Sequence, residues 1–511
     1  MNRGPSPPAV PGGLFLGVRG EGIPILRRLV DRVLEHHRAL REGAFAEERP
    51  GLEPATRRPA REGGTGIEAA LEDLLSRLER NAPFFHPRYA AQMIKDPSIP
   101  AVVGYLATQL INPNNHAYEG GPATTDMEIE VVRDLLGLVG FEEGGRPAGW
   151  GHLCSGGTLA NLEALWAVRD SRPDGPLVIS RVAHYSWKRC AAILRIPRVI
   201  EVEVDARLRM DADHLETILK QERPLMVVAN FGSTGTGSID PIAAILSLRD
   251  RHGFHLHVDA AYGGYVRACL RAADGSIHPA SVVRENTGMS EAVYGQVRAL
   301  EGADSITIDP HKHGLSPYGA GSVLYRDERL KGALLNTAPY TYHLADRPNL
   351  GMVTLEGSRP GAAAAACWLT HRVLPLTSEG LGAIVGSGLR AARALHDRTA
   401  GAHHARPLHE PDLDILCLVR LPPGTGALSI TSVNRATESV YDRYSVGAPG
   451  RPALILSRFN LPADIAARAI PGLSADAPTL TALRIVLMKH WLGQADHAAL
   501  LREIGSAVLE S

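Results

Sequence analysis

The feature that most constrains the fold is a regular alternation of short β-type runs and helical segments, which begins at about Gly151. Six such runs follow one another: Pro176–Ser180, Val199–Val204, Leu225–Asn230, Phe254–Asp259, Ser305–Asp309 and Gly321–Tyr325. Strands that alternate with helices are typical of an α/β fold, in which helices cover both faces of a mainly parallel sheet. Ligands of such a sheet bind outside the carboxyl ends of its strands. The polar residues that follow each run are therefore the first candidates for a functional site.

The chain is long enough for more than one compact unit, because its 511 residues exceed the roughly 250–300 that share a single core. Turn-forming and charged residues dominate residues 46–66, whereas residues 23–41 show the spacing of an amphipathic helix. After about Leu376, the β-type runs 414–421 and 453–459 indicate a smaller α+β domain. We expect an N-terminal arm and linker (1–66), an N-terminal segment (67–150), a large domain (151–376) and a small C-terminal domain (377–511).

Charge and cysteine content favour a cytoplasmic enzyme that acts on small molecules. The formal net charge is -1, so no global field attracts nucleic acid or an anionic membrane. The five cysteines are scattered without metal-ligand or redox spacing, which predicts a reduced compartment and no metal site. No signal peptide and no apolar run of membrane-spanning length is evident. We therefore expect neither nucleic acid nor a membrane as a partner.

The most informative strand end is Ser305-Ile-Thr-Ile-Asp-Pro-His-Lys312-His-Gly, where an alternating run leads into a turn that presents Lys312. A lone lysine is usually a solvated surface amine. Here histidines flank the lysine and a Gly-Leu-Ser-Pro-Tyr-Gly-Ala-Gly segment follows, which is unusual for a solvent-exposed face. Desolvation beside polar partners makes a lysine amine nucleophilic enough to form an imine. The motif indicates such a lysine at the edge of the sheet.

A second strand end, Phe254-His-Leu-His-Val-Asp259-Ala-Ala-Tyr-Gly-Gly, places an aspartate after a buried run. Taken alone, this aspartate would be read as the cap of the next turn. Together with Lys312, it is suited to hold a pyridine nitrogen in its protonated form, which makes the ring an electron sink. The two motifs support each other.

Three further segments carry weaker signals. The turn Ser155-Gly-Gly157-Thr158 precedes a helical segment and fits a phosphate, although an ordinary N-cap turn has the same composition. His184 follows the run 176–180, where an imidazole is either structural or stacked on a planar cofactor. The hydroxyl groups near Thr234 reach a cofactor or serve a polar turn.

In order along the chain, the motifs GHLCSGGTLANL, AHYSWK, STGTGSIDP, HVDAAYGGY and TIDPHKHG resemble those of the group II pyridoxal-phosphate (PLP) dependent amino-acid decarboxylases. The resemblance runs from about Ile67 onward. Within that family, PFFHPRYAAQM, NPNNHAYEGGPATTDMEIE and TLEGSRPGAAAAACW are most similar to bacterial tyrosine decarboxylases. The resemblance implies PLP fold type I, the aspartate-aminotransferase-like fold, with a seven-stranded sheet. It also implies a homodimer with shared active sites, to which residues 67–150 contribute.

The resemblance further implies roles around the cofactor ring. Lys312 would carry PLP as a Schiff base, and Asp259 would pair with the pyridine nitrogen. His184 would stack on one face of the ring, and Ala261 would pack on the other. Thr234 would lie near the ring hydroxyl or Asp259.

Other matching positions concern the phosphate and the reacting carbon. Gly157 and Thr158 would bind the phosphate, with Asp309 and His311 close by. In this family a loop tyrosine protonates the carbon that has lost carbon dioxide. Tyr340 and Tyr342 stand in the matching region, and we favour Tyr342.

The substrate side chain is the least constrained part of the prediction. Five residues are candidates for its pocket: Tyr89, His116, Pro122, Thr124 and His313. The resemblance favours an aromatic amino acid such as L-tyrosine, decarboxylated to its amine. Imidazoles at 116 and 313 would also suit a polar or acidic side chain, so decarboxylation of an acidic or aliphatic amino acid stays open. Aldehyde synthesis and carbon–carbon bond cleavage on the same cofactor also stay open, as does a non-catalytic binding module.

Overall fold

The computed structural model describes residues 20–46, 66–141, 149–337, 344, 346–424, 428–448 and 454–509. These residues form two compact units, one made of Met1–Tyr89 with Arg443–Ile455 and the other of Ala90–Asp442 with Leu456–Ser511. The four-part division that the sequence suggests stays a prediction. Across the described residues, no helix combines the length and the apolar character that crossing a membrane requires.

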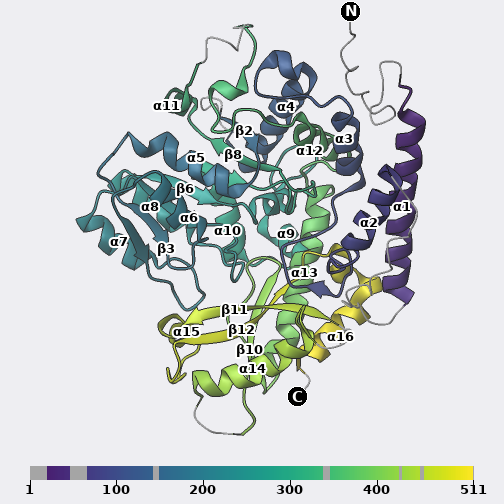
Figure 1. Ribbon diagram of the computed structural model, residues 1–511. Coiled ribbons are helices and arrows are strands. Elements are labelled where there is room, and N and C mark those ends of the chain that lie inside the picture. The colour runs from purple at the N-terminus through teal and green to yellow at the C-terminus, as the bar shows by residue number, and fades with distance from the viewer. Residues whose placement is uncertain are drawn as a thin grey trace, which may run out of the picture. The chain divides into compact units, whose positions relative to one another are not determined.

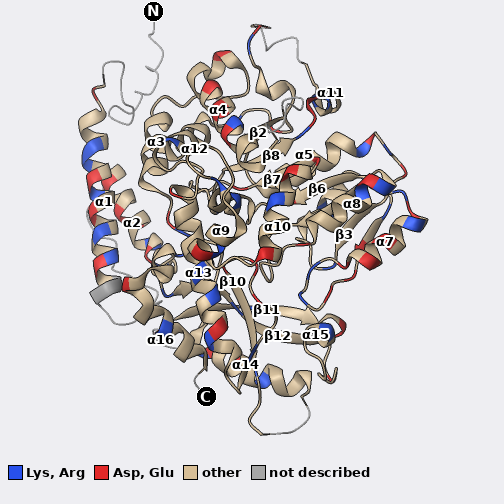
Figure 2. Cartoon of the chain, turned by 180° about the vertical axis from the view of Figure 1, so that it is seen from behind, with Lys and Arg blue, Asp and Glu red and all other residues tan. Residues whose placement is uncertain are grey.

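The first unit contains α1 (Ile23–Ala46) and α2 (Ile67–Leu78), and the predicted arm helix is therefore present. Ion pairs join the two helices, with Arg32 Nε 2.6 Å from Glu72 Oε1. Figure 2 shows basic and acidic residues interleaved along α1. Within α1, Arg38 pairs with Glu42 one turn later, an arrangement that supports exposed helices.

The second unit is built on the predicted seven-stranded sheet (Figure 1), with the strand order β2-β8-β7-β6-β5-β3-β4. The strands are β2 (Trp150–Cys154), β3 (Leu177–Ser180), β4 (Val199–Val202), β5 (Met226–Asn230), β6 (His255–Asp259), β7 (Ser305–Ile308) and β8 (Gly321–Tyr325). Neighbours from β4 to β7 pair in parallel, and β8 is antiparallel to both β7 and β2. The fold prediction is confirmed.

Helices pack on both faces of this sheet, α4 and α8 in one core and α5 and α6 in the other. The helices along this part of the chain are α3 (Ile99–Gln109), α4 (Pro122–Val139), α5 (Gly157–Arg169), α6 (Ser186–Ile193), α7 (Ala212–Gln221), α8 (Ile242–His252), α9 (Ala280–Thr287), α10 (Glu291–Ala299), α11 (Lys331–Leu334), α12 (Gly361–Val373) and α13 (Leu381–Ala400). Adjacent residues of β5 point to opposite faces of the sheet and pack in different hydrophobic clusters. Val227 belongs to the cluster that contains residues of α4 and α8, and Val228 belongs to the cluster that contains residues of α5 and α6. Strand residues alternate between faces, so this burial on both sides requires a continuous apolar run.

A smaller sheet contains four neighbouring antiparallel strands in the order β11-β12-β10-β9. Its strands and the helices around it are β9 (Ala405–Pro407), β10 (Ile415–Arg420), α14 (Ile430–Tyr444), β11 (Ile455–Pro462), α15 (Ala463–Ala469), β12 (Thr479–Val486) and α16 (Ala498–Leu509). The sequence indicated β10 and β11 but not β12, which lies between them. The α+β character expected for this region is observed.

Candidate active site

A cavity of about 390 Å³ lies where the turns after β3, β5, β6 and β7 meet the turn between β2 and α5. All the residues predicted to contact a cofactor line it: Gly157, Thr158, His184, Thr234, Asp259, Ala261, Asp309, His311 and Lys312. Residues that were not predicted complete the lining: Ser155, Gly156, Leu159, Asn161, Tyr185, Asn230, Gly232, Ser233 and Tyr262. The parallel sheet thus brings five separate motifs to one place.

Lys312 stands in the turn after β7 and points its amine at Asp309, with 2.9 Å between Nζ and Oδ2. Burial by itself would lower the pKa of the Lys312 amine, but the charge and hydrogen bond of Asp309 more than offset burial, so the pKa is raised. The amine is therefore held as a cation at the cavity wall. It becomes a nucleophile only after it gives up a proton.

Asp259 ends β6, and two helices fix its carboxylate. Asn161 Nδ2 of α5 donates to Oδ2 at 2.8 Å, and Trp187 Nε1 of α6 donates to the same oxygen at 3.0 Å. The backbone N–H of Ala261 donates to Oδ1 at 3.3 Å. The carboxylate is held in one orientation at the edge of the cavity, where it can accept a hydrogen bond from a ring nitrogen.

Asn161 and Trp187 were not predicted from the sequence. A signal for Asn161 existed, because it stands four residues after Gly157 and so shares that face of α5. Trp187 belongs to the AHYSWK motif, but its role depends on a contact with β6 that no local pattern shows. Its side chain is fully buried.

The turn at Gly156 and Gly157 forms a cradle that side chains would fill. A Cβ atom at Gly157 would lie 3.0 Å from Asp309 Oδ2 and 3.2 Å from Ala261 Cβ. A Cβ atom on Gly321 of β8 would lie 2.4 Å from Gly156 Cα. The cradle opens on the first turn of α5, whose N–H groups have no acceptor within the helix and favour an anion.

Two buried polar atoms beside this cradle, Asp309 Oδ1 and His311 Nδ1, have no hydrogen-bond partner among the residues that the structure describes. The ring of His311 stacks on Tyr318, with 4.5 Å between centroids. Burial lowers the pKa of His311 despite the nearby Asp309. Unpaired polar atoms are rare inside proteins and are expected where a ligand supplies the missing partner.

His184 occupies the turn between β3 and α6. Its Nδ1 lies 2.7 Å from Ser186 Oγ, and this contact fixes the ring. Burial lowers the pKa of His184, although Asp259 opposes the shift. The imidazole is therefore neutral at pH 7 and offers a flat, uncharged face to the cavity.

A second cavity of about 660 Å³ adjoins the first and shares His184, Tyr185 and Thr234 with it. Apolar and aromatic residues form much of its remaining wall: Met93, Ile94, Val182, Ala183, Tyr318, Phe459, Leu461, Pro462 and Ile465. Arg181, Arg458 and Arg484 also line it. A cavity with apolar walls and a few convergent charged groups is suited to a small molecule that carries both kinds of group.

The residues proposed for the substrate pocket lie elsewhere in the structure. His116, Pro122 and Thr124 gather at the start of α4, where Thr124 Oγ1 donates to Asn115 Oδ1 at 2.5 Å. None of these three, nor His313, is among the described residues that line either cavity. Tyr89 belongs to the first unit. Tyr340 and Tyr342 lie outside the described residues. These assignments stay predictions.

Comparisons with known proteins identify the family. The profile of the pyridoxal-dependent decarboxylase conserved domain matches residues 60–418. L-tyrosine decarboxylase of Levilactobacillus brevis is 30% identical over 84% of this chain and 83% of its own length. Aspartate 1-decarboxylase of Aliivibrio fischeri is 28% identical over 79% of this chain and 77% of its own length. The crystal structure of Oryza sativa TDC with PLP and tryptamine shares the fold, with a TM-score of 0.74 and 16% identity. The match covers 95% of this chain and 98% of the rice chain.

The first cavity fits the cofactor of this family. Lys312 would supply an amine for an aldehyde, and Asp259 would supply a fixed carboxylate for a ring nitrogen. The glycine cradle and the unpaired atoms beside it suit a phosphate and other polar groups of the ligand. Sequence and cavity thus lead to the same conclusion, and the chain belongs to the pyridoxal-dependent decarboxylase family as a PLP-dependent amino-acid decarboxylase.

Proposed function

We propose that the protein decarboxylates an aromatic L-amino acid, with L-tyrosine as the leading candidate. The observation that carries this proposal is the largely apolar cavity next to Lys312, which includes the rings of Tyr185, Tyr318 and Phe459. An aromatic side chain gains more from such walls than a small acidic one, because each aromatic ring buries a large apolar area. The relative from Levilactobacillus brevis, named L-tyrosine decarboxylase, supports the same choice.

The cavity residues divide the work of this reaction. PLP, when bound, supplies a protonated pyridine ring that takes up the electron pair of the broken bond between Cα and the carboxylate. Asp259 would hold the proton on the ring nitrogen, and Lys312 would hold the cofactor until a substrate amine replaces it. His184 would place its neutral ring against the cofactor. Tyr342 is proposed, on the resemblance alone, as the donor of the proton that Cα receives.

Arg458 of the second cavity is the proposed partner of the substrate carboxylate. Arg484 lines the same cavity but is buried, and its Nε and Nη1 already donate to the backbone oxygens of Thr234 and Ala91. Arg458 is exposed and lies over the ring of Tyr441, 5.1 Å from its centroid. Guanidinium groups bind carboxylates in a fixed geometry, which helps to align the bond that breaks.

The proposal predicts which amino acids release carbon dioxide. With PLP added, tyrosine and other aromatic L-amino acids are expected to react at least about 10-fold faster than aspartate or leucine, a discrimination of about 1.4 kcal/mol. Carbon dioxide release and mass spectrometry of the amine measure this, with Lys312→Ala as the background control. A preference for aspartate would overturn the aromatic assignment and leave the family assignment intact.

We also propose that the protein is a homodimer that pairs through α3. Six apolar side chains in and beside this helix are exposed: Ile99, Val102, Val103, Leu106, Leu110 and Ile111. Ile99 and Ile111 are 80% and 79% exposed, which is unusual for isoleucine in a monomer. A symmetric partner would cover this patch with an identical patch, because self-complementary surfaces form closed dimers.

Val103→Glu is expected to convert the dimer to a monomer, because it places a charge in an apolar interface. Light scattering coupled to gel filtration measures the mass. Ile193→Glu, at a position on α6 that is 60% exposed, is the matched control and is expected to leave the mass unchanged. An unaltered mass for Val103→Glu would contradict the assignment of α3.

The cellular location is the remaining part of the proposal. All five cysteines are free and buried, at positions 154, 190, 269, 367 and 417. Free thiols persist in reduced compartments. We therefore place the protein in the cytoplasm.

A further inference from the structure

Asp414 is a buried carboxylate that contacts both strand ends of the active site. It stands just before β10 and is 1% exposed. Its Oδ1 accepts a hydrogen bond from the hydroxyl of Tyr262 at 2.6 Å. Its Oδ2 lies 3.4 Å from Nε2 of His313. The rings of Tyr262 and His313 also touch, with 4.6 Å between centroids.

Both partners of Asp414 are adjacent to the reacting groups. Tyr262 lies three residues after Asp259 and lines the first cavity. His313 directly follows Lys312. The two segments arrive from neighbouring parallel strands, β6 and β7, and the strand pairing ends at Asp259 and Thr307. Asp414 contacts one residue from each of the two segments that follow these strands, Tyr262 after β6 and His313 after β7.

Asp414 is closely packed against α13. A Cβ atom at Gly388 would lie 3.0 Å from Asp414 Oδ2, so a side chain there would crowd the carboxylate. Burial alone would raise the pKa of Asp414, but His313 and Tyr262 more than offset it, and the pKa is lowered. Lys95 and Lys489 are the nearby cations.

The lysines near Asp414 are themselves perturbed. Burial lowers the pKa of Lys95 to about 8 and that of Lys489 to about 7, while Asp96 and Asp414 oppose the shift in both. At neutral pH, a smaller fraction of each lysine amine is therefore protonated than in an exposed lysine. Asp414 thus accepts one hydrogen bond, from Tyr262, and makes a charge contact of 3.4 Å between Oδ2 and His313 Nε2, two atoms that have no hydrogen-bond partner among the described residues.

We propose that Asp414 is a positioning residue that sets the distance between Lys312 and Asp259 by holding His313 and Tyr262 on one carboxylate. His313, expected from the sequence to touch the substrate, acts in this arrangement as the link between Asp414 and the lysine turn. The proposal relies on the PLP chemistry of the cavity but not on which amino acid is the substrate.

Asp414→Asn tests the proposal in the full-length holoenzyme. The amide keeps the size of the side chain but removes its charge, so the turn after Lys312 loses its anchor. The pH at which the visible absorbance of the lysine-bound cofactor changes is expected to shift by about 0.5 to 1 unit. With the substrate identified by the carbon dioxide assay, kcat is expected to fall about 10-fold with little change in KM.

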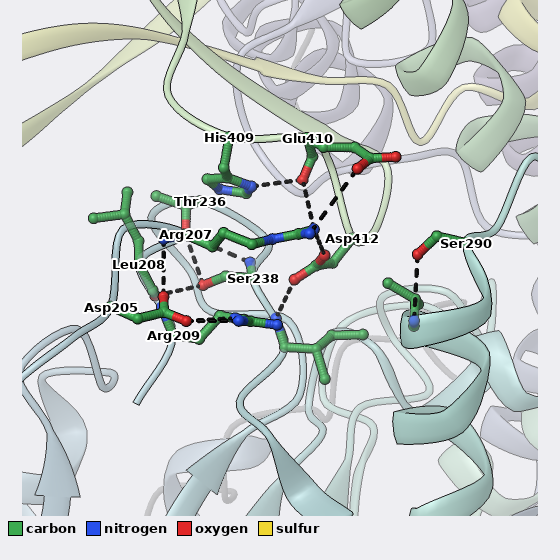
Figure 3. Close-up of polar contacts among 12 residues, drawn as sticks. Asp205, Arg207, Leu208, Arg209, Thr236, Ser238, Ser290, His409, Glu410 and Asp412 are labelled. Atoms are coloured by element: carbon green, nitrogen blue, oxygen red, sulfur yellow. Dashed lines mark hydrogen bonds and ion pairs between the residues drawn. The ribbon is translucent and has the colours of Figure 1, made fainter. Parts of the chain in front are cut away.

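Two further variants separate positioning from folding. Tyr262→Phe removes only the hydroxyl and is expected to shift the absorbance profile in the same direction. Combined with Asp414→Asn, it should add little, because both act through one contact. Asp412→Asn is the matched control, since Asp412 is also buried but accepts hydrogen bonds from Arg207 at 2.8 Å (Figure 3) and from the N–H of Ile239 at 2.9 Å. None of these three residues is among the described residues that line either cavity.

Asp412→Asn is expected to lower the melting temperature and to leave the absorbance profile in place. An Asp414→Asn holoenzyme whose profile coincides with that of Asp412→Asn would overturn the proposal, as would a Tyr262→Phe profile identical to wild type. The absorbance readout requires no substrate. An incorrect substrate assignment therefore leaves this test intact.

Discussion

Replacing Lys312 with alanine is expected to lower kcat/KM for decarboxylation by about 10³-fold or more, because the variant loses both its nucleophile and a proton-transfer group. The amine stands 2.9 Å from Asp309 at the wall of the cavity, and the pKa of Lys312 is raised by that partner. Without the covalent attachment, the cofactor is also expected to leave the protein on gel filtration. Carbon dioxide release and the visible absorbance of the eluted protein measure the two effects.

The alanine variant also leaves Asp309 without its cation, so a second substitution is required to separate chemistry from stability. Lys312→Arg keeps a positive charge beside Asp309 but provides no amine that can form an imine. It should be as inactive as Lys312→Ala and closer to wild type in melting temperature. Lys188→Ala removes an exposed lysine that pairs with Glu201 and is expected to keep full activity. Substantial turnover by Lys312→Arg would exclude Lys312 as the cofactor lysine.

The central sheet could be predicted because its strands are apolar runs bounded by polar turns. The run predicted at Pro176–Ser180, for example, contains β3 at Leu177–Ser180. Strand β2 was not predicted, since it carries His152, which is buried only because Glu163 lies 2.7 Å away on α5. Strand β12 was missed for a similar reason, because it buries Arg484. A polar residue inside a strand interrupts the apolar pattern that predicts the strand, and the sequence does not show that a distant partner allows it to be buried.

Half of the lining of the first cavity was predictable, because its motifs follow runs of apolar residues along the chain and the family resemblance assigned roles within them. The second cavity was not, because its walls come from residues 92–94, 181–185, 457–465 and 484, which only the tertiary fold brings together. His313 illustrates the same limit. Its position next to Lys312 suggested contact with a substrate, which stays a prediction, and no local pattern indicated that its Nε2 would lie 3.4 Å from Oδ2 of Asp414, far along the chain.

Asp259→Asn is expected to reduce kcat by about 10²- to 10³-fold, the usual loss when one preorganised electrostatic group is removed from an active site. An amide carries no negative charge, so it cannot hold the proton on the ring nitrogen, and the ring becomes a weaker electron sink. The hydrogen bonds from Asn161 and Trp187 can be retained, because both donate to one oxygen and an asparagine side chain also has one. The variant should therefore fold and bind PLP.

The appropriate comparison is with Asp240→Asn, because Asp240 is fully buried and accepts hydrogen bonds from the N–H groups of Met210 and Asn230 but does not line the cavity. That variant measures the cost of losing a buried carboxylate without touching the cofactor. If both variants lost activity only in proportion to their loss of folded protein, Asp259 would be a structural residue. A large fall in kcat confined to Asp259→Asn, with PLP still bound, would show that the charge itself drives the reaction, since the shape of the side chain and its two donors are preserved.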